Sequence, residues 1–201
     1  MLKNEIFPGL FIYSNVISNS LNIIDRLESA IDSSNRRRSW QNGEVGHKYL
    51  SKDYRNCLNI KIQKRDAVFK PKYEEELDSI WQDVYDLKKP IVDDYCKKFN
   101  IEMNYWEAMN FIKYGIGQHF DEHSDHGYSY ICTVSTITYL NDNYRGGELY
   151  FPKINIRIKP EAGQVIIFPS TYLFSHIAEP VLEGTKYCIA TMLDYNKNNK
   201  L

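Results

Sequence analysis

The sequence lacks any long hydrophobic run and any closely spaced cysteine pair, and each absence excludes a class of protein. No stretch is long and apolar enough to cross a bilayer, and the apolar run at residues 10–13 is too short for a signal peptide, so we expect a cytoplasmic location. The four cysteines form no Cys-x-x-Cys pair, which argues against a zinc ribbon or a disulfide scaffold and fits a reducing compartment. They are Cys57, Cys96, Cys132 and Cys188.

The sequence also lacks an excess of charge of either sign. The formal net charge is −1, so no overall field draws the chain to nucleic acid or to an anionic membrane, and we expect neither partner. Hydrophobic residues make up 43% and charged residues 25%, the balance of an ordinary soluble globular protein. With no internal repeat and no low-complexity linker, residues 1–201 predict a single domain with a sizeable core.

The first half of the chain is mainly helical by its hydrophobic spacing. After a short opening strand, residues 18–33 carry apolar side chains at helical spacing and predict an amphipathic helix. Residues 73–99 show the longest helical pattern, which we expect Pro90 to kink or split. Residues 57–62 alternate apolar and polar and predict a half-buried strand. Residues 1–100 are therefore expected to be mainly helical support, with one further element.

That further element is the stretch at residues 34–56, which shows neither helical nor strand periodicity. It holds three consecutive arginines, a tryptophan and two glycines. A solvated loop would explain it, but long irregular loops in compact domains are often binding elements, so a mobile lid is the alternative. If the stretch is a lid, Trp40 and Arg38 are the side chains that we expect to contact a substrate.

The second half of the chain is rich in short strand patterns. Stretches of β-branched and aromatic residues alternate with Gly and Pro turns. They cover residues 106–114, 128–140, 148–151, 154–158, 164–168 and 187–193. Many short strands after an initial helical region predict an α+β protein whose β unit, at residues 105–195, is a sandwich or jelly roll.

Residues 119–125, His-Phe-Asp-Glu-His-Ser-Asp, hold the densest group of functional side chains. Two chemical interpretations compete for it. His-x-x-Glu-His, from His119 to His123, is a zinc-protease pattern. His123-Ser124-Asp125 is the His-x-Asp half of a facial iron site, which a distant histidine would complete. A polar surface loop without chemistry is the third interpretation.

The flanking residues favour the iron site over the protease. A zinc-protease motif needs a helix, and the glycines before this stretch and the Ser-Asp-His-Gly sequence at its end oppose one. On an extended strand, residues i and i+2 face the same side, so His123 and Asp125 could reach one metal. His176 follows a buried strand and precedes the last one, so a β-fold could place it opposite. The other histidines are His47, His119 and His126.

Further motifs recur in a fixed order between residues 114 and 192. They are Tyr114, Gly117-Gln118, His123-Ser124-Asp125, Thr138-Tyr139-Leu140-Asn141, Gly146-Gly147-Glu148, Phe151-Pro152, Lys159-Pro160, Gly163, His176, Glu179-Pro180-Val181, Gly184 and Lys186. In this order and spacing the sequence resembles the 2-oxoglutarate- and Fe(II)-dependent oxygenases, specifically their prolyl 4-hydroxylase branch. The resemblance implies a double-stranded β-helix, or jelly-roll, core with N-terminal helices packed on one sheet.

The resemblance also implies a metal site and a reaction. His123, Asp125 and His176 would hold Fe(II), leaving positions for 2-oxoglutarate and O2. The family reaction converts 2-oxoglutarate to succinate and CO2 while a substrate is hydroxylated, and the cofactor supplies the difficult chemistry. Ascorbate is a candidate accessory cofactor.

Three further residues match positions that bind 2-oxoglutarate in this family. Lys186 follows His176 by ten residues, where the family places a Lys or Arg for the distal carboxylate. On a strand it would share a face with small and apolar residues, as an inward-facing counter-ion should. Tyr114 and Tyr139 match tyrosines that hydrogen-bond the same carboxylate.

Some positions depart from the family pattern. Leu149 replaces a threonine that touches 2-oxoglutarate in several relatives, Cys132 stands where prolyl hydroxylases often have an arginine, and Met192 stands where relatives often have tryptophan. None of them breaks the metal or cosubstrate site. Cys132 and Met192 weaken the inference to a prolyl substrate. With Leu149 they fit an apolar wall that would contact substrate, and they also fit plain core packing.

We therefore expect a dioxygenase that hydroxylates prolyl residues of a proline-containing peptide or protein. The alternative enzyme would hydroxylate a free amino acid or another small molecule. The alternative from another class is an inactive jelly-roll binding module, against which the complete ligand set and Lys186 argue. The sequence leaves the oligomeric state open.

Overall fold

The computed structural model describes residues 2–17, 20–32, 34–35, 38–43, 51–63, 72–127 and 131–196. In these residues, no helix is long and apolar enough to cross a membrane. The elements are β1 (Leu2–Phe7), β2 (Leu10–Ser14), α1 (Ser20–Ala30), β3 (Gln41–Asn42), β4 (Arg55–Asn56), β5 (Leu58–Ile62), α2 (Lys72–Phe99), β6 (Tyr105–Trp106), β7 (Met109–Tyr114), β8 (His119–His123), β9 (Val134–Tyr139), β10 (Arg145–Gly146), β11 (Leu149–Phe151), β12 (Ile156–Ile158), β13 (Val165–Pro169), β14 (His176–Ala178), β15 (Val181–Glu183) and β16 (Lys186–Asp194).

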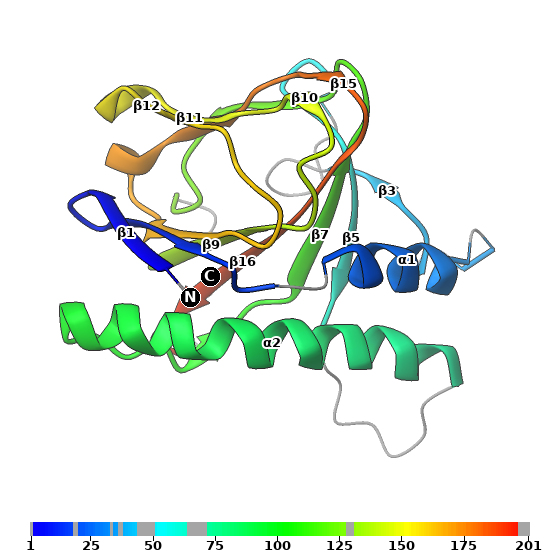
Figure 1. Ribbon diagram of the computed structural model, residues 1–201, viewed down its shortest axis with the longest axis horizontal. Coiled ribbons are helices and arrows are strands. Elements are labelled where there is room, and N and C mark those ends of the chain that lie inside the picture. The colour runs from blue at the N-terminus through cyan, green and yellow to red at the C-terminus, as the bar shows by residue number, and fades with distance from the viewer. Residues whose placement is uncertain are drawn as a thin grey trace.

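Two antiparallel sheets face each other across an apolar interior (Figure 1). The large sheet has the order β1-β2-β13-β9-β16-β7-β5-β3, and β6 pairs with the end of β16. The small sheet has the order β12-β11-β14-β8-β4, and β10 pairs with β15 beside it. Side chains of both sheets form one buried cluster, as in a β-sandwich, and this is the facing arrangement that a jelly roll requires.

Period-two alternation divides the large sheet into two faces. On β16, Tyr187, Ile189 and Leu193 belong to the apolar cluster that also contains helix residues. Cys188 and Ala190 belong to the cluster between the two sheets. Because successive side chains on a strand point to opposite faces, each strand of the large sheet contributes to both clusters. We call the side that faces the small sheet the inner face.

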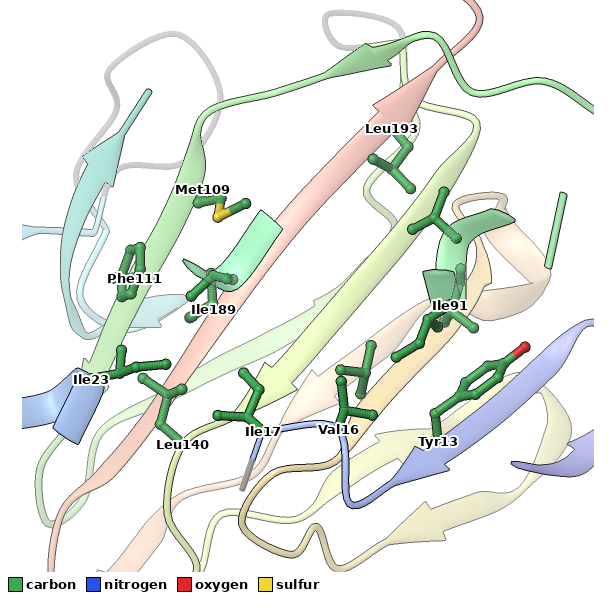
Figure 2. Packing of buried hydrophobic residues seen from close by; sticks show 14 of the residues in the cluster. Tyr13, Val16, Ile17, Ile23, Ile91, Met109, Phe111, Leu140, Ile189 and Leu193 are labelled. Atoms are coloured by element: carbon green, nitrogen blue, oxygen red, sulfur yellow. The ribbon is translucent and has the colours of Figure 1, made fainter. Parts of the chain in front are cut away.

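The two helices share an apolar cluster with the opposite side of the large sheet (Figure 1, Figure 2). Leu27 of α1 and Ile80 of α2 are fully buried in it, together with Phe111 and Ile189 of the sheet. Figure 2 shows Phe111, Ile189 and Ile91 of α2 among the side chains of this cluster. Burial of this helix face is what stabilises long amphipathic helices in folded proteins.

Pro90 does not split the second helix, contrary to one of the two outcomes expected from the sequence. α2 runs without interruption from Lys72 to Phe99 with Pro90 inside it. Pro90 is exposed, whereas Ile91 and Val92 beside it are buried in the helix–sheet cluster. Apolar burial on the other face of the helix offsets the hydrogen bond that the proline removes.

The stretch at residues 34–56 is less irregular than its sequence indicates. β3 pairs with β5 at one end of the large sheet, and β4 pairs with β8 in the small sheet. Residues 36–37 and 44–50, including His47, lie outside the described residues. The role of a mobile lid therefore stays a prediction, but both described ends of this stretch are anchored in sheets.

Candidate metal and cosubstrate site

The three side chains expected to bind iron come together on the small sheet. His176 on β14 lies in register with His123 on β8, and their ring centroids are 4.3 Å apart. Asp125 follows the end of β8 in a bend, not on an extended strand as the sequence analysis assumed, and its Oδ1 lies 3.8 Å from Nε2 of His123. One ligand atom from each residue lies within 4.8 Å of the others. Two imidazoles and one carboxylate on one side are the donor set of a facial Fe(II) site.

Backbone carbonyls fix both histidine rings with the same nitrogen facing the site. Nδ1 of His123 lies 2.7 Å from the carbonyl oxygen of Asp121, and Nδ1 of His176 lies 3.1 Å from that of Phe174. A neutral imidazole that donates from Nδ1 keeps the Nε2 lone pair free for a metal. Phe120 stacks on the His123 ring, with centroids 3.5 Å apart and planes 14° apart. Groups of this chain alone therefore orient both rings for metal coordination.

The protonation state of His123 also suits a metal ligand. Burial lowers the pKa of His123, and the neighbouring His176 lowers it further, while Asp125 acts in the opposite direction. The ring is therefore neutral at neutral pH, which is the form that coordinates a metal. The residues present thus fit Fe(II) in donor type, orientation and charge.

His119 and His126 contact backbone carbonyls away from the three ligands, and His47 lies outside the described residues. Nδ1 of His119 lies 3.3 Å from the carbonyl oxygen of Gly117, and its Nε2 lies 3.2 Å from that of Asp53. Nδ1 of His126 lies 2.7 Å from the carbonyl oxygen of Cys132. His119 is also on a strand, not on the helix that a zinc-protease motif needs. The structure therefore gives no support to the protease interpretation.

Lys186 provides a buried cation on the inner face of the large sheet. It is 1% exposed, and its Nζ donates a hydrogen bond to the carbonyl oxygen of Gly147 at 2.7 Å. Among the described residues, no salt bridge joins this ammonium to a carboxylate. Burial lowers the pKa of Lys186, because the charged form loses hydration without gaining a close counter-ion. A buried ammonium in this state fits the carboxylate of a ligand.

Two tyrosines border Lys186 as the sequence analysis expects. Lys186 pairs in register with Tyr114, and its Nζ lies 5.0 Å from the Tyr114 ring centroid and 5.4 Å from the Tyr139 ring centroid. Burial raises the pKa of Tyr114 and of Tyr139 well above the ordinary range, so both hydroxyls keep their protons. Two hydroxyl donors and one ammonium on a dry wall are suited to the distal carboxylate of 2-oxoglutarate.

The Gly146-Gly147 pair makes room for Lys186. Both glycines have positive φ, +72° and +66°. A Cβ on Gly147 would lie 3.2 Å from Cδ of Lys186 and 3.1 Å from Cε2 of Tyr144. A side chain at position 147 would therefore require Lys186 and Tyr144 to shift by a few tenths of an ångström, and the positive φ would strain it.

The four residues expected to contact substrate are not all at the site. Trp40 packs against the helix–sheet cluster and donates from Nε1 to Glu28 at 3.1 Å, and Arg38 forms an ion pair with Asp32 at 2.6 Å. Trp40 lies on the helix side of the large sheet, because it neighbours Tyr187 and not Lys186. Arg38 lines a cavity together with residues of α1 and Glu76 of α2. The structure does not bring them to the metal ligands.

Cys132 and Met192 lie closer to the expected site. Cys132 is buried, its Sγ lies 3.0 Å from Oγ of Ser170, and burial raises the pKa of its thiol to about 11. Asp125 is near enough to raise that pKa further. Met192 is half-buried on the inner face of β16, by the alternation that places Lys186 there. Contact of either with substrate stays a prediction.

The sequence analysis missed Arg55, which lies beside the first histidine ligand. Its guanidinium lies 4.6 Å from the ring centroid of Phe120, which in turn stacks on His123. Arg55 reaches this position because β4 pairs with β8, Arg55 against Phe120. No local sequence pattern indicates this pairing, because two-residue strands carry no periodicity.

Comparison with known proteins finds similar sequences and structures. Residues 109–193 match the family model of the 2OG-Fe(II) oxygenase superfamily. A protein of Acanthamoeba polyphaga mimivirus, provisionally named a prolyl 4-hydroxylase, is 30% identical over 121 residues, which are 49% of this chain and 49% of that protein. This chain thus spans about half the length of that relative. A PKHD-type hydroxylase of Prochlorococcus marinus (strain MIT 9313) is 27% identical over 169 residues, 81% of this chain and 70% of that one.

Solved structures share the fold. A prolyl hydroxylase from Trichoplax adhaerens, in complex with a hypoxia inducible factor oxygen degradation domain peptide fragment, superposes with a TM-score of 0.71 at 18% identity, covering 92% of this chain and 83% of that one. At this identity the likeness concerns the fold alone. The jelly-roll core expected from the sequence is thereby confirmed.

Proposed function

Because residues 109–193 match the family model of the 2OG-Fe(II) oxygenase superfamily, we propose that this chain hydroxylates prolyl residues of a peptide or protein and releases succinate and CO2 as co-products. The proposal rests on one observation above all. Nδ1 of each histidine ring is held by a backbone carbonyl, and the ligand atoms of both rings and of Asp125 lie within 4.8 Å of one another. On the facing sheet lies a buried Lys186 that no salt bridge among the described residues joins to a carboxylate. A metal site alone would fit many proteins, but the separate buried cation fits a dicarboxylate cosubstrate.

Each residue of the site then has a defined task. His123, Asp125 and His176 hold Fe(II) from one side. Lys186 binds the distal carboxylate of 2-oxoglutarate, with the hydroxyls of Tyr114 and Tyr139 as further donors. The bound iron and cosubstrate supply O2 activation and oxygen insertion into a C–H bond. The protein supplies position and an interior that excludes water.

The names of the similar proteins support a prolyl substrate. The mimivirus relative carries the name of a prolyl 4-hydroxylase, and the Trichoplax structure holds a peptide fragment. Proline has a preset φ and no N–H, so shape and apolar contact must provide most of its recognition. Met192 and Ala190, half-buried on the inner face, offer such contacts. A role for ascorbate and a cytoplasmic location stay predictions.

Succinate formation by the purified, Fe(II)-loaded protein tests this proposal. We expect a synthetic peptide of Ala-Pro-Gly repeats to stimulate succinate release, and the matched peptide with Ala in place of Pro to give no stimulation. Stimulation by free proline but by no peptide would assign the enzyme to small molecules. No succinate under any of these conditions would support the inactive binding module.

A further inference from the structure

Two asparagines lie on the inner face of the large sheet, on the same wall as the cosubstrate residues. On β5, Ile60 and Ile62 point to the helix–sheet cluster, so Asn59 between them points inward. On β7, Phe111 belongs to the helix–sheet cluster, so Asn110 points inward as well. Polar amides at such positions replace the apolar side chains that an ordinary core would have.

The two side-chain amides form one hydrogen bond with each other, and one oxygen and one nitrogen of the pair remain without a partner among the described residues. Nδ2 of Asn59 donates to Oδ1 of Asn110 at 3.0 Å, and each residue is only 8% exposed. Oδ1 of Asn59 is buried and has no partner in the part of the chain that the structure describes. Nδ2 of Asn110 donates no hydrogen bond among these residues either. A buried carbonyl oxygen without a donor destabilises the fold, so its presence indicates a function other than stability.

The position of the pair separates it from the cosubstrate. Asn110 is in register with Ala190, whereas Tyr114 is in register with Lys186. Four residues along a strand span about 13 Å, which exceeds the length of a five-carbon dicarboxylate held at Lys186. The asparagines therefore face the part of the interior that 2-oxoglutarate does not fill, on the same side as Met192.

We propose that Asn59 and Asn110 form a substrate subsite that hydrogen-bonds the main-chain amides of an extended peptide beside its target residue. The pair offers one acceptor, Oδ1 of Asn59, and one donor, Nδ2 of Asn110, which complement a peptide N–H and C=O. Proline has no N–H, so these main-chain groups must come from its neighbours. Two neutral amides suit a neutral peptide group and provide no counter-charge for the ammonium or carboxylate of a free amino acid. This inference rests on the proposed function and specifies the substrate class.

The double variant Asn59→Leu/Asn110→Leu tests the subsite, with Asn4→Leu on the exposed edge strand β1 as the control. The probe is the Ala-Pro-Gly repeat peptide. We expect its KM to rise roughly tenfold or more in the double variant, as the loss of two hydrogen bonds requires. The KM for 2-oxoglutarate and the succinate formed without peptide should stay unchanged. The Tm should stay level or rise, because both amides are replaced by apolar side chains of similar size.

The outcomes separate the subsite from the proposed function. A wild-type protein that forms no succinate refutes the proposed function. Normal succinate formation combined with an unchanged peptide KM in the double variant overturns the subsite alone. A wild type that forms succinate but is not stimulated by the peptide overturns the peptide substrate and the subsite together. A lower Tm with unchanged KM shows that the pair is structural. If the double variant does not fold, the single variant Asn110→Leu should raise the peptide KM by roughly threefold or more, as the loss of one hydrogen bond requires.

Discussion

His123 and His176 face each other in register on neighbouring antiparallel strands, with their ring centroids 4.3 Å apart. One strand pair therefore positions both histidines, and Asp125 joins them from the bend that follows β8. Hydrogen bonds along the β8–β14 pair keep the two rings at a fixed distance even before a metal binds. This arrangement holds the protein ligands rigidly on one side of the site.

Removal of any one of these three side chains should abolish activity without unfolding the protein. We expect His123→Ala, Asp125→Ala and His176→Ala each to lose Fe(II)-dependent succinate formation, because two ligands hold the metal far less tightly than three. Far-UV circular dichroism should show an unchanged fold. The control is His119→Ala, whose ring nitrogens lie near the backbone carbonyls of Gly117 and Asp53 and near the Asp121 carboxylate. Equal loss of activity in the control would revive the protease interpretation.

Lys186→Ala should act on the cosubstrate and not on the metal. A ligand carboxylate buried without its charge partner costs about 3–5 kcal/mol, so the KM for 2-oxoglutarate should rise at least roughly a hundredfold. Fe(II) affinity should change little. Lys186→Arg should recover part of the loss, and Lys89→Ala on the exposed side of α2 serves as the matched control. An unchanged KM for 2-oxoglutarate would remove Lys186 from the site.

Much of this site was predictable because its residues follow local patterns. The alternation of residues 57–62 indicated β5, and the apolar runs indicated β9 and β13, so these strands of the large sheet were predicted. The His-x-Asp spacing and the interval from His176 to Lys186 are likewise local in the sequence.

The parts of the fold and of the site that the sequence did not predict depend on pairings between distant segments. β8 is too polar and β14 too short to carry a strand pattern, so the sheet that holds both histidines was not foreseen. The polar edge strand β1 was missed for the same reason. Trp40 was assigned to substrate because its loop lacked periodicity, whereas tertiary contacts with Glu28 and Tyr187 decide where it lies. Such contacts have no signature in a single sequence.

Trp40→Ala should therefore lower stability and leave catalysis intact. The half-buried indole packs on the helix–sheet cluster and donates to Glu28, so its loss should lower the free energy of unfolding by roughly 2 kcal/mol. Urea unfolding measures this change, and the peptide KM should equal that of the wild type. A raised KM with unaltered stability would place Trp40 in contact with substrate after all.

Lys88 should make stability depend on pH. It is fully buried on α2, donates to Oγ1 of Thr191 at 2.8 Å, and burial lowers its pKa to about 7. Between about pH 7 and the unfolded value of 10.5, the unfolded chain holds a proton that the folded chain has lost. Stability from this group therefore rises with pH through that window, by at most about 1.4 kcal/mol per unit, and is level below pH 7.

Lys88→Met isolates this effect. The variant should be more stable than the wild type at pH 7. Its stability should also rise less steeply between pH 7.5 and 10, because it has no buried lysine ammonium that must lose its charge. Urea unfolding at several pH values measures both, with Lys89→Met as the exposed control. Parallel curves for the wild type and Lys88→Met would show that Lys88 folds without a change in its pKa.

The most direct test of the proposed function locates the added oxygen. The Fe(II)-loaded protein is incubated with 2-oxoglutarate, isotopically labelled O2, free proline and the Ala-Pro-Gly repeat peptide, and the products are analysed by tandem mass spectrometry. We predict one labelled oxygen atom on a proline residue of the peptide, one in succinate, and almost none on free proline. Labelled free amino acid with an unmodified peptide, or succinate formation with no label on any proline, would contradict a peptidyl-prolyl hydroxylase.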